Sequence, residues 1–349
     1  MTPSENPPTL RDVSAATGFS IYTVSRALRN LSGVSEATRA QIAAAASRLG
    51  YVPNRSAQTL KRRSSTTIGI LTANNANPFY STLVNGFEDV VVRAGYHCII
   101  SDATDHGEYS RERESRFLED LLQQRVAAVA LTYQPGEGQL KRLLEWPMPL
   151  VFMDSHPPRE RPEAPSVVVD GEAVSYEVGR HFAEHDYRDW LFVGHPQTWT
   201  TRGSRQAGFT RAAEEFGAAL TVVEGHNDPT DSAAAVHAAF ADRGAPFRAV
   251  FAANEPLVIG TLRALRSLDL SVPDDVAIVG YDEFDWAEFA APRMTVVDQE
   301  VTRIGRAAGE RILHEIERHG SESGAEPVWK PEQPQPRARL VVRDSCGVH

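Results

Sequence analysis

The chain has 349 residues, a hydrophobic content of 42% and a formal net charge of −10. This composition suits a globular protein with a sizeable core, and no apolar run approaches the roughly 18–20 residues that a membrane-spanning helix needs. The charge is unevenly divided, because residues 1–66 carry a balance of +6 and residues 67–349 a balance of −16. Such asymmetry is expected when one small domain meets nucleic-acid phosphates and the rest of the chain must not.

Residues 1–8 are polar and proline-rich, and they predict a disordered arm. They contain neither a basic start nor an apolar stretch, so we expect no secretory signal and a reduced cytoplasmic setting. The two cysteines, Cys98 and Cys346, suggest neither a disulfide framework nor a metal site. We expect no metal and no cofactor, and we expect the scattered histidines, including His181 and His185, to lie at the surface.

Residues 9–52 predict a domain of three short helices. Thr9, Ser20 and Ser35 are suitable N-caps, and Gly18 and Gly50 can end the first and third helices in a left-handed backbone conformation. Helical spacing gives each helix an inward face, comprising Leu10, Val13 and Ala16 or Thr17 in the first, Val24, Ala27 and Leu28 in the second, and Ile42, Ala45, Ala46 and Leu49 in the third. Two helices joined by such a turn form a helix-turn-helix, which places its second helix in the major groove of DNA.

The outward face of the second helix predicts base contacts from Ile21, Tyr22, Ser25 and Arg26. Arg26 is a candidate for a bidentate hydrogen bond to guanine. We expect Thr23 and Asn30 to contact phosphates. The alternative at this point is a small three-helix domain without a DNA role.

Residues 53–66 predict a hinge helix over 54–60 and a linker. A helix of seven residues is marginal in water, so it needs a partner or DNA to form. Phosphate contacts are expected from the basic residues Arg55, Lys61, Arg62 and Arg63. The alternative is a simple basic linker.

Residues 67–349 predict alternating strands and helices in two sets separated by a proline-rich break at 157–165. The first set has strands at 68–71, 96–100, 126–131 and 150–153 and helices at 78–94, 108–124 and 139–146. The second has strands at 167–169, 190–193, 220–224, 249–252 and 276–279 and helices at 172–185, 204–216, 232–243 and 255–268, followed by a helix at 301–317 and a strand at 339–342. This alternation indicates two lobes built on parallel sheets covered by helices on both faces.

Polar residues follow several predicted strands, where ligands bind in such sheets. Asp154, Asn254 and Asp282 come directly after strands, Arg205 opens a helix, and Gln299 follows Val296–Val297. Matched carboxylate, amide and guanidinium groups can hydrogen-bond vicinal hydroxyls, and Phe79, Tyr80, Trp199 or Trp286 could cover an apolar ligand face. The alternative for each Asp or Asn is a helix cap or turn.

Three short motifs are similar to those of the lactose repressor (LacI/GalR) family of bacterial transcriptional regulators: Thr-Val-Ser-Arg-Ala-Leu at 23–28, Val-Ser-x-x-Thr-Arg at 34–39 and Leu-Gly-Tyr-x-Pro-Asn at 49–54. The resemblance covers nearly the whole chain, and one departure is Ser14, where the family usually has alanine. It implies an N-terminal all-α helix-turn-helix domain and an α/β two-lobed, periplasmic-binding-protein-like sensor domain. That sensor would have an N-lobe at about 67–168 and 298–328 and a C-lobe at about 169–297 and 329–349.

The resemblance also implies roles for individual residues. The hinge helices of two subunits would enter the minor groove, where Leu60, one turn after Ala57, would wedge between base pairs. Effector contacts would come from Asp154, Arg205, Asn254, Asp282 and the segment 77–80. Residues 225–230 lack the aromatic side chain that the family often places against the ligand.

We therefore expect a ligand-responsive, DNA-binding transcriptional regulator of a bacterial cytoplasm, associated with the nucleoid and acting as a repressor. It would bind a near-palindromic double-stranded operator as a homodimer, with pairing into tetramers left open. The expected effector is a sugar, with a nucleobase as the alternative. The rival classes are a solute-binding protein and an α/β enzyme, but the chain shows no nucleophile elbow, phosphate loop or Cys-x-x-Cys motif.

Overall fold

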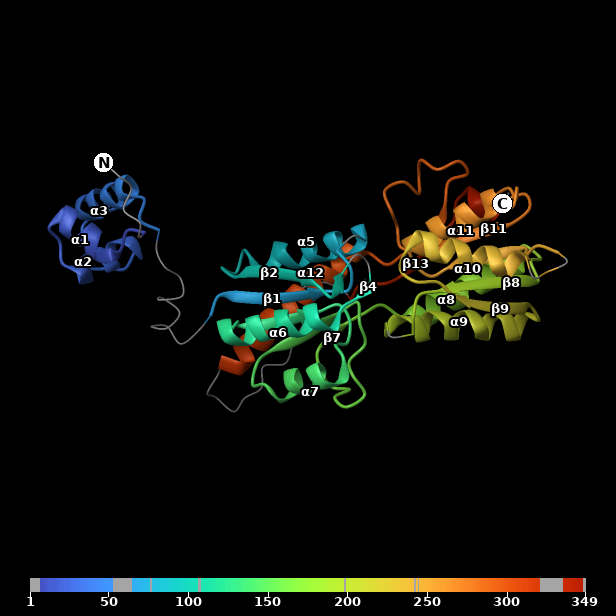
Figure 1. The fold of residues 1–349 in the computed structure, drawn as a ribbon, viewed down its shortest axis with the longest axis horizontal. Coiled ribbons are helices and arrows are strands. Elements are labelled where there is room, and N and C mark those ends of the chain that lie inside the picture. Colours follow the sequence, from blue (N-terminus) through green and yellow to red (C-terminus); the bar gives the residue numbers. More distant parts are fainter. Residues whose placement is uncertain are drawn as a thin grey trace. The chain divides into compact units, whose positions relative to one another are not determined.

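The computed structural model describes residues 7–52, 65–75, 77–105, 108–197, 199–241, 243, 245–320 and 335–347. The chain divides into two compact units, Met1–Ser65 and Thr66–His349 (Figure 1). The predicted hinge helix, with Arg55, Ala57, Leu60, Lys61, Arg62 and Arg63, lies outside the described residues, as does most of the predicted N-terminal arm.

The first unit contains the three predicted helices, α1 (Leu10–Thr17), α2 (Ile21–Leu28) and α3 (Glu36–Leu49). Ser20 Oγ accepts a hydrogen bond from Thr23 N at 3.1 Å, and Ser35 Oγ accepts one from Thr38 N at 3.2 Å. Each bond satisfies a backbone donor that the first helical turn leaves free. The predicted starts of α2 and α3 are therefore confirmed.

Glycines end two of these helices as expected. Gly18 follows α1 with φ 75° and Gly50 follows α3 with φ 67°, both in the left-handed region. The core of the unit contains Val13, Val24, Ala27, Ile42 and Ala46. The prediction that Leu49 faces inward is wrong, because the chain turns at Gly50 and Tyr51 packs against the core, leaving Leu49 40% exposed.

The second unit begins with a five-stranded parallel sheet in the order β2-β1-β5-β6-β7. We call this sheet and its helices the N-lobe. Its strands are β1 (Thr67–Thr72), β2 (His97–Asp102), β5 (Ala128–Leu131), β6 (Leu150–Met153) and β7 (Ser166–Val167), and its helices are α5 (Pro78–Val91), α6 (Arg111–Gln124), α7 (Glu137–Glu145) and α12 (Val301–Gly320).

Helices cover both faces of the N-lobe sheet. Side chains of α5 and α12 share one apolar cluster with alternate strand residues such as Ile68 and Ile70, and side chains of α6 and α7 share another with Leu71 and Val129. Figure 1 shows α5 beside α12. The expected helix at 108–124 begins only at Arg111, because residues 108–109 form a strand of the small antiparallel pair β3 (Thr104–Asp105) and β4 (Glu108–Tyr109).

The C-lobe is built on a six-stranded sheet in the order β13-β12-β11-β10-β8-β9. Its strands are β8 (Asp189–Gly194), β9 (Ala219–Glu224), β10 (Ala249–Ala252), β11 (Ala277–Tyr281), β12 (Thr295–Asp298) and β13 (Arg339–Val341); its helices are α8 (Gly171–Glu184), α9 (Thr201–Phe216), α10 (Pro229–Ala241), α11 (Glu255–Ser267) and the short η1 (Asp344–Cys346). All neighbouring strands are parallel except β13, which runs antiparallel to β12. The sheet was expected to be parallel throughout, but its edge strand β13 is antiparallel.

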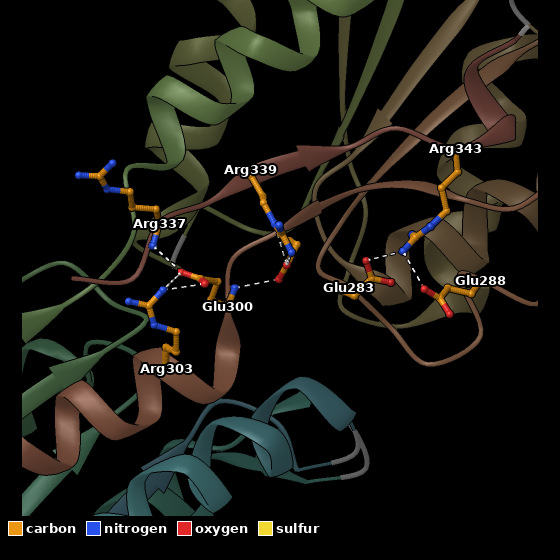
Figure 2. Close-up of polar contacts among 8 residues, drawn as sticks. Glu283, Glu288, Glu300, Arg303, Arg337, Arg339 and Arg343 are labelled. Atoms are coloured by element: carbon orange, nitrogen blue, oxygen red, sulfur yellow. Dashed lines mark hydrogen bonds and ion pairs between the residues drawn. The ribbon is translucent and has the colours of Figure 1, made fainter. Parts of the chain in front are cut away.

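Ion pairs tie the segments around β12 and β13 together (Figure 2). Asp298 accepts hydrogen bonds from Arg339 Nε at 3.2 Å and Nη2 at 2.9 Å. Glu300, where the chain leaves β12 for α12, accepts bonds from Arg303 and from Arg337 N. These bonds, chiefly those from Arg303, lower the pKa of Glu300. They hold a connection through which the chain passes from the C-lobe sheet to an N-lobe helix.

Candidate functional site

The predicted DNA-reading face lies on α2. Ile21 is 45% exposed and Tyr22 is 70% exposed, so both side chains are accessible to a partner. Arg26 Nη1 donates a hydrogen bond to Tyr22 Oη at 3.0 Å, and its guanidinium also donates to the carbonyl of Ser32. The two side chains that we expect to read bases are therefore held together before any partner is present.

Two residues predicted to contact phosphates have partners within the first unit. Thr23 Oγ1 lies 2.9 Å from Ser20 Oγ. Asn30, with φ 54°, accepts a hydrogen bond from Arg39 Nη1 at 2.9 Å, and Arg39 also bonds the carbonyls of Ala27 and Leu31. These contacts fix the connection between α2 and α3.

The predicted effector residues gather in one pocket at the carboxyl ends of strands from both lobes. The side chains that line it are Asn77, Phe79, Tyr80, Thr132, Asp154, His195, Trp199, Thr200, Thr201, Arg205, Asn227, Asn254 and Asp282. The structure thus brings together Phe79, Tyr80, Asp154, Arg205, Asn254 and Asp282, six of the seven residues predicted for the effector site. Convergent polar groups with aromatic neighbours at such strand ends are typical of a small-molecule site.

Arg205 is the charged centre of the pocket. It is only 4% exposed, its Nη1 donates to the carbonyl of Ala253 at 2.6 Å, and its guanidinium carbon lies 3.6 Å from the centroid of the Tyr281 ring. Burial alone would lower its pKa, but the nearby Tyr281, Asp282 and Asp154 raise it overall. Its Nε has no hydrogen-bond partner among the described residues, so the guanidinium retains a donor for a ligand.

Two buried carboxyl groups accompany Arg205. Asp154 follows β6 and Asp282 follows β11, each with a positive φ (51° and 81°) and each with a backbone N–H donated to the neighbouring strand. Burial raises the pKa of Asp154 to about 7 and that of Asp282 to about 6, against the opposing effect of Arg205. Near neutral pH both carboxyls can exchange a proton, so each can accept or donate a hydrogen bond.

Gln299 differs from the other predicted effector residues because it is not among the side chains that line the pocket. It is fully buried, and its Nε2 donates a hydrogen bond to Asp282 Oδ1. Its place in the structure is behind Asp282, which it orients.

Asn254 has both a capping role and a place in the pocket. Its Oδ1 caps α11 by accepting from Leu257 N at 3.1 Å, and its Nδ2 donates to Asn227 Oδ1 at 2.7 Å. The capping alternative considered for this residue is correct, although the residue also lines the pocket.

The aromatic residues of the pocket come from two segments. Phe79 and Tyr80 lie at the start of α5, and Trp199 precedes α9. Trp286 is not part of the lining, because it stacks on Phe284 at 4.2 Å and donates to Glu255 Oε1 at 2.8 Å. Segment 225–230, which lacks the aromatic residue that the family often has there, contributes Asn227 to the lining.

Five of the lining residues were not predicted from the sequence: Thr132, His195, Thr200, Thr201 and Asn227. His195 follows β8 directly, so the strand-end rule that found Asp154 could have found it. The expectation that the histidines lie at the surface is wrong for His195 and His181, which are both buried. Burial, helped by Arg205, lowers the pKa of His195 to about 3, so this imidazole is neutral and can accept or donate a hydrogen bond.

Other kinds of site are not apparent in the part of the chain that the structure describes. It contains no group of three or more His, Cys, Asp or Glu side chains placed to hold a metal ion. It also contains no helix that combines the length and the hydropathy needed to cross a membrane.

Each of the two units matches a known protein family. Residues 9–54 match the sequence family described as bacterial regulatory proteins, lacI family, and residues 180–346 match the periplasmic binding protein-like domain. Curated relatives include the HTH-type transcriptional repressors PurR of Photobacterium profundum (27% identical) and Vibrio campbellii (29% identical), each aligned over 314 residues that cover 88% of this chain and 92% of the relative.

Solved structures give the same result for the fold. The lac repressor dimer bound to operator and the anti-inducer ONPF matches with a TM-score of 0.81 at 23% identity, covering 98% of this chain and 100% of that one. The complex of the transcriptional regulator CelR with cellobiose matches with a TM-score of 0.68 at 26% identity, covering 97% and 99%. The chain therefore combines a lacI-family helix-turn-helix domain with a two-lobed, periplasmic-binding-protein-like domain, which is the architecture of the lac repressor structures.

Proposed function

We propose that a small polar molecule, bound by Asp154, Arg205 and Asp282 between the two lobes, controls the affinity of this repressor for its operator. The observation that carries the proposal is the presence in one chain of two separate features: a helix-turn-helix with a projecting Tyr22–Arg26 pair, and a buried charged pocket lined from both lobes. A protein with only one of these features could bind DNA or a ligand but could not couple the two.

On the DNA side, Ile21, Tyr22, Ser25 and Arg26 would read base edges in the major groove, and Thr23, Asn30, Arg55, Lys61, Arg62 and Arg63 would meet phosphates. Base-edge contacts provide sequence specificity, whereas phosphate contacts provide affinity and register. A homodimer would place two copies of α2 on the half-sites of a near-palindromic operator. Dimers could pair into tetramers without changing this arrangement.

Coupling requires the effector to bind one arrangement of the lobes more tightly than another. Because the lining side chains come from both lobes, a ligand that contacts Asp154 in the N-lobe and Arg205 in the C-lobe favours the closed arrangement. Closure would then alter the position of the segment that leads to the DNA-binding unit, releasing or strengthening the hinge according to whether the ligand is an inducer or a corepressor.

A nucleobase is the effector class that the curated relatives favour, since those reported above share the name PurR. A nucleobase carries donors and acceptors along one planar edge, which suits a guanidinium flanked by two carboxyls that can each donate or accept. Phe79, Tyr80 and Trp199 offer ring surfaces for its faces. This weighting reverses the order expected from the sequence, in which a sugar came first.

A sugar is the second candidate, and a specific observation favours it. The lining contains nine side chains with hydroxyl, amide or carboxyl groups, and the 26% identical CelR was solved with cellobiose. Vicinal hydroxyls of a sugar would be bound by Asp154, Arg205 and Asp282 in bidentate fashion.

Thermal unfolding of the full chain with each class of compound tests the effector site. A ligand at a hundred times its dissociation constant stabilises the folded state by about 2.7 kcal/mol, which is readily detected. We expect stabilisation by adenine, guanine, hypoxanthine or uracil, or else by a mono- or disaccharide, and we expect its loss in Arg205→Ala and Asp282→Ala. Arg211→Ala, on the exposed side of α9, is the control that should keep the shift. A shift that survives in both pocket variants would place the ligand elsewhere.

Leu60→Ala tests the proposed hinge independently. The variant should bind operator more weakly without changing its effector affinity, because Leu60 would act only through its wedge between base pairs. Operator binding equal to that of the wild type would remove Leu60 from the mechanism.

A further inference from the structure

Trp199 belongs to the C-lobe, but it is partly buried against the core of the N-lobe. It lies between β8 and α9 of the C-lobe, and its side chain joins an apolar cluster whose other members all come from residues 71–164. These include Leu71, Leu118, Leu131, Phe152 and the partly buried Tyr80. Among the described residues of that cluster, Trp199 alone comes from the other lobe.

The N-lobe holds the contact surface for Trp199 rigidly. Tyr133, which follows β5, meets Trp199 edge to face, with ring centroids 5.3 Å apart and an interplanar angle of 76°. Tyr133 Oη donates a hydrogen bond at 2.8 Å to Oε2 of Glu114, and Glu114 Oε1 accepts another from Gly136 N at 3.1 Å. Glu114 has no exposed surface, so its carboxylate is oriented by contacts within the protein.

Thr200 makes a second contact across the cleft. Its Oγ1 lies 3.0 Å from Ser155 Oγ and accepts a hydrogen bond from His156 N at 3.0 Å. Ser155 and His156 follow directly after Asp154, one of the two carboxyls in the pocket. A single pair of neighbouring C-lobe residues therefore contacts the N-lobe on both its apolar and its polar side.

This pair also leads into the helix that carries the charged centre of the pocket. α9 begins at Thr201, and Arg205 lies one turn further on. Trp199, Thr200, Thr201 and Arg205 all line the pocket. Arg202 N, in the first turn of α9, donates a hydrogen bond to the carbonyl of Trp199 at 3.0 Å, so a displacement of α9 that carries Arg205 toward or away from the N-lobe also carries Trp199.

We propose that Trp199 and Thr200 form a latch that fastens the C-lobe to the N-lobe when the cleft is closed, and that Glu114 positions Tyr133 to receive it. The proposal rests on the proposed function, since it says how ligand binding in the pocket would change the arrangement of the two lobes. Trp199 and Tyr133 are positioning residues here. The latch would engage in closed protein and withdraw from the N-lobe cluster as the cleft opens.

The test uses ligand-free, full-length protein labelled with 5-fluorotryptophan. The chain has five tryptophans, and the fluorine resonance of Trp199 is assigned by its loss in Trp199→Phe. Tyr133→Ala should move this resonance toward a solvent-exposed position and increase its solvent isotope shift. Loss of an aromatic pair should raise the ratio of open to closed protein roughly 2- to 10-fold.

Milder variants keep the test decisive if Tyr133→Ala folds poorly. Tyr133→Phe and Glu114→Gln retain the ring and should shift the same resonance less, and Thr200→Val should shift it by removing the polar contact. Tyr187→Phe is the matched control, since Tyr187 Oη donates to the carbonyl of Cys346 within the C-lobe and lies outside the pocket.

The latch would be overturned if the Trp199 resonance and its isotope shift are unchanged in Tyr133→Ala. If Tyr133→Ala is unfolded, the same conclusion follows when Tyr133→Phe and Glu114→Gln both leave them unchanged. Because no ligand or DNA enters this measurement, its outcome is separate from that of the proposed function. A wild-type protein that fails to bind any effector or operator would contradict the proposed function while leaving the fluorine result to stand alone.

Discussion

At the scale of single residues, the pocket lined from both lobes contains one buried cation, Arg205, and two buried carboxyls, Asp154 and Asp282. Arg205 is held by the carbonyl of Ala253 and by the Tyr281 ring, so its direction is set without help from either carboxyl. Asp154 Oδ1 has no hydrogen-bond partner among the described residues. A buried polar atom of this kind costs free energy in the absence of a ligand, and a ligand that supplies its partner recovers that free energy.

The raised pKa of Asp282 predicts how stability depends on pH. The folded carboxyl keeps its proton up to a pH of about 6, whereas the unfolded one releases it near 3.8. Between these values the folded state binds more protons, so the unfolding free energy falls as the pH rises and levels off above about 6. Asp282→Asn removes the ionising group and with it this fall in unfolding free energy. Between pH 5 and pH 8 the unfolding free energy of the variant should therefore rise relative to that of the wild type by roughly 1–2 kcal/mol.

Denaturant unfolding of ligand-free protein at the two pH values measures this difference. Asp186→Asn is the control, because its carboxyl is almost fully exposed and the substitution should leave the wild-type pH dependence in place. A constant difference between Asp282→Asn and the wild type at both pH values would show that the carboxyl is ionised throughout.

At the scale of secondary-structure elements, the helix-turn-helix depends on local capping. Ser35→Ala removes the acceptor for Thr38 N and should cost about 1 kcal/mol, which corresponds to a roughly fivefold loss of hydrogen-exchange protection in α3. Ser47→Ala, at an exposed site in the same helix, should leave protection unchanged. Equal protection in Ser35→Ala and the wild type would mean that packing alone sets the start of α3.

Two helices of the N-lobe approach so closely that only glycine fits between them. A Cβ atom at Gly305 of α12 would lie 2.1 Å from the carbonyl oxygen of Leu83 in α5. Gly305→Ala should therefore lower the unfolding free energy of the second unit by about 1–3 kcal/mol, measured by denaturant unfolding. Gly138→Ala in α7, where the added carbon would meet no heavy atom within 4 Å beyond its chain neighbours and its own helix backbone, should leave stability unchanged or raise it by up to about 1 kcal/mol. Equal stability of both variants would show that α5 and α12 can separate without cost.

Local signals explain which elements the sequence could predict. Ser20, Ser35, Gly18 and Gly50 mark helix ends by chemistry confined to a few residues, and the structure has those ends where they were expected. The strands 150–153 and 249–252 were predicted to the residue, because short, buried apolar runs have few alternatives in a parallel sheet. The antiparallel direction of β13 and the exposure of Leu49 depend on what packs nearby in space, which spacing along the chain does not encode.

The same distinction applies to the pocket. Asp154, Arg205 and Asp282 could be found because strand ends converge in α/β sheets. Gln299 was expected at the ligand but lies behind Asp282, and Trp286 was expected as a ring wall but packs on Phe284. The packing of Trp199 against the opposite lobe, and the hydrogen bond of Tyr133 to the buried Glu114, are long-range contacts that the sequence pattern does not show.

At the scale of the whole molecule, charge is divided between the DNA-binding and sensor regions. Residues 1–66 carry +6 within a chain of −10, so attraction to phosphates is confined to one part of the protein. If six to ten phosphates are contacted per dimer, operator affinity should fall roughly 10³- to 10⁵-fold between about 50 and 200 mM salt. Fluorescence anisotropy over that salt series measures the slope, and an affinity insensitive to salt would contradict the assigned phosphate contacts.

The most direct test of an effector-controlled repressor is to select double-stranded DNA from a random library with the full chain. Binding of the enriched sequence is then measured by anisotropy with and without the compound that stabilises the protein. We expect a near-palindromic sequence, weaker binding by Arg26→Ala, and an affinity that the effector changes in the wild type but not in Arg205→Ala. No enriched sequence, or an enriched sequence whose binding the effector leaves unchanged, would contradict it.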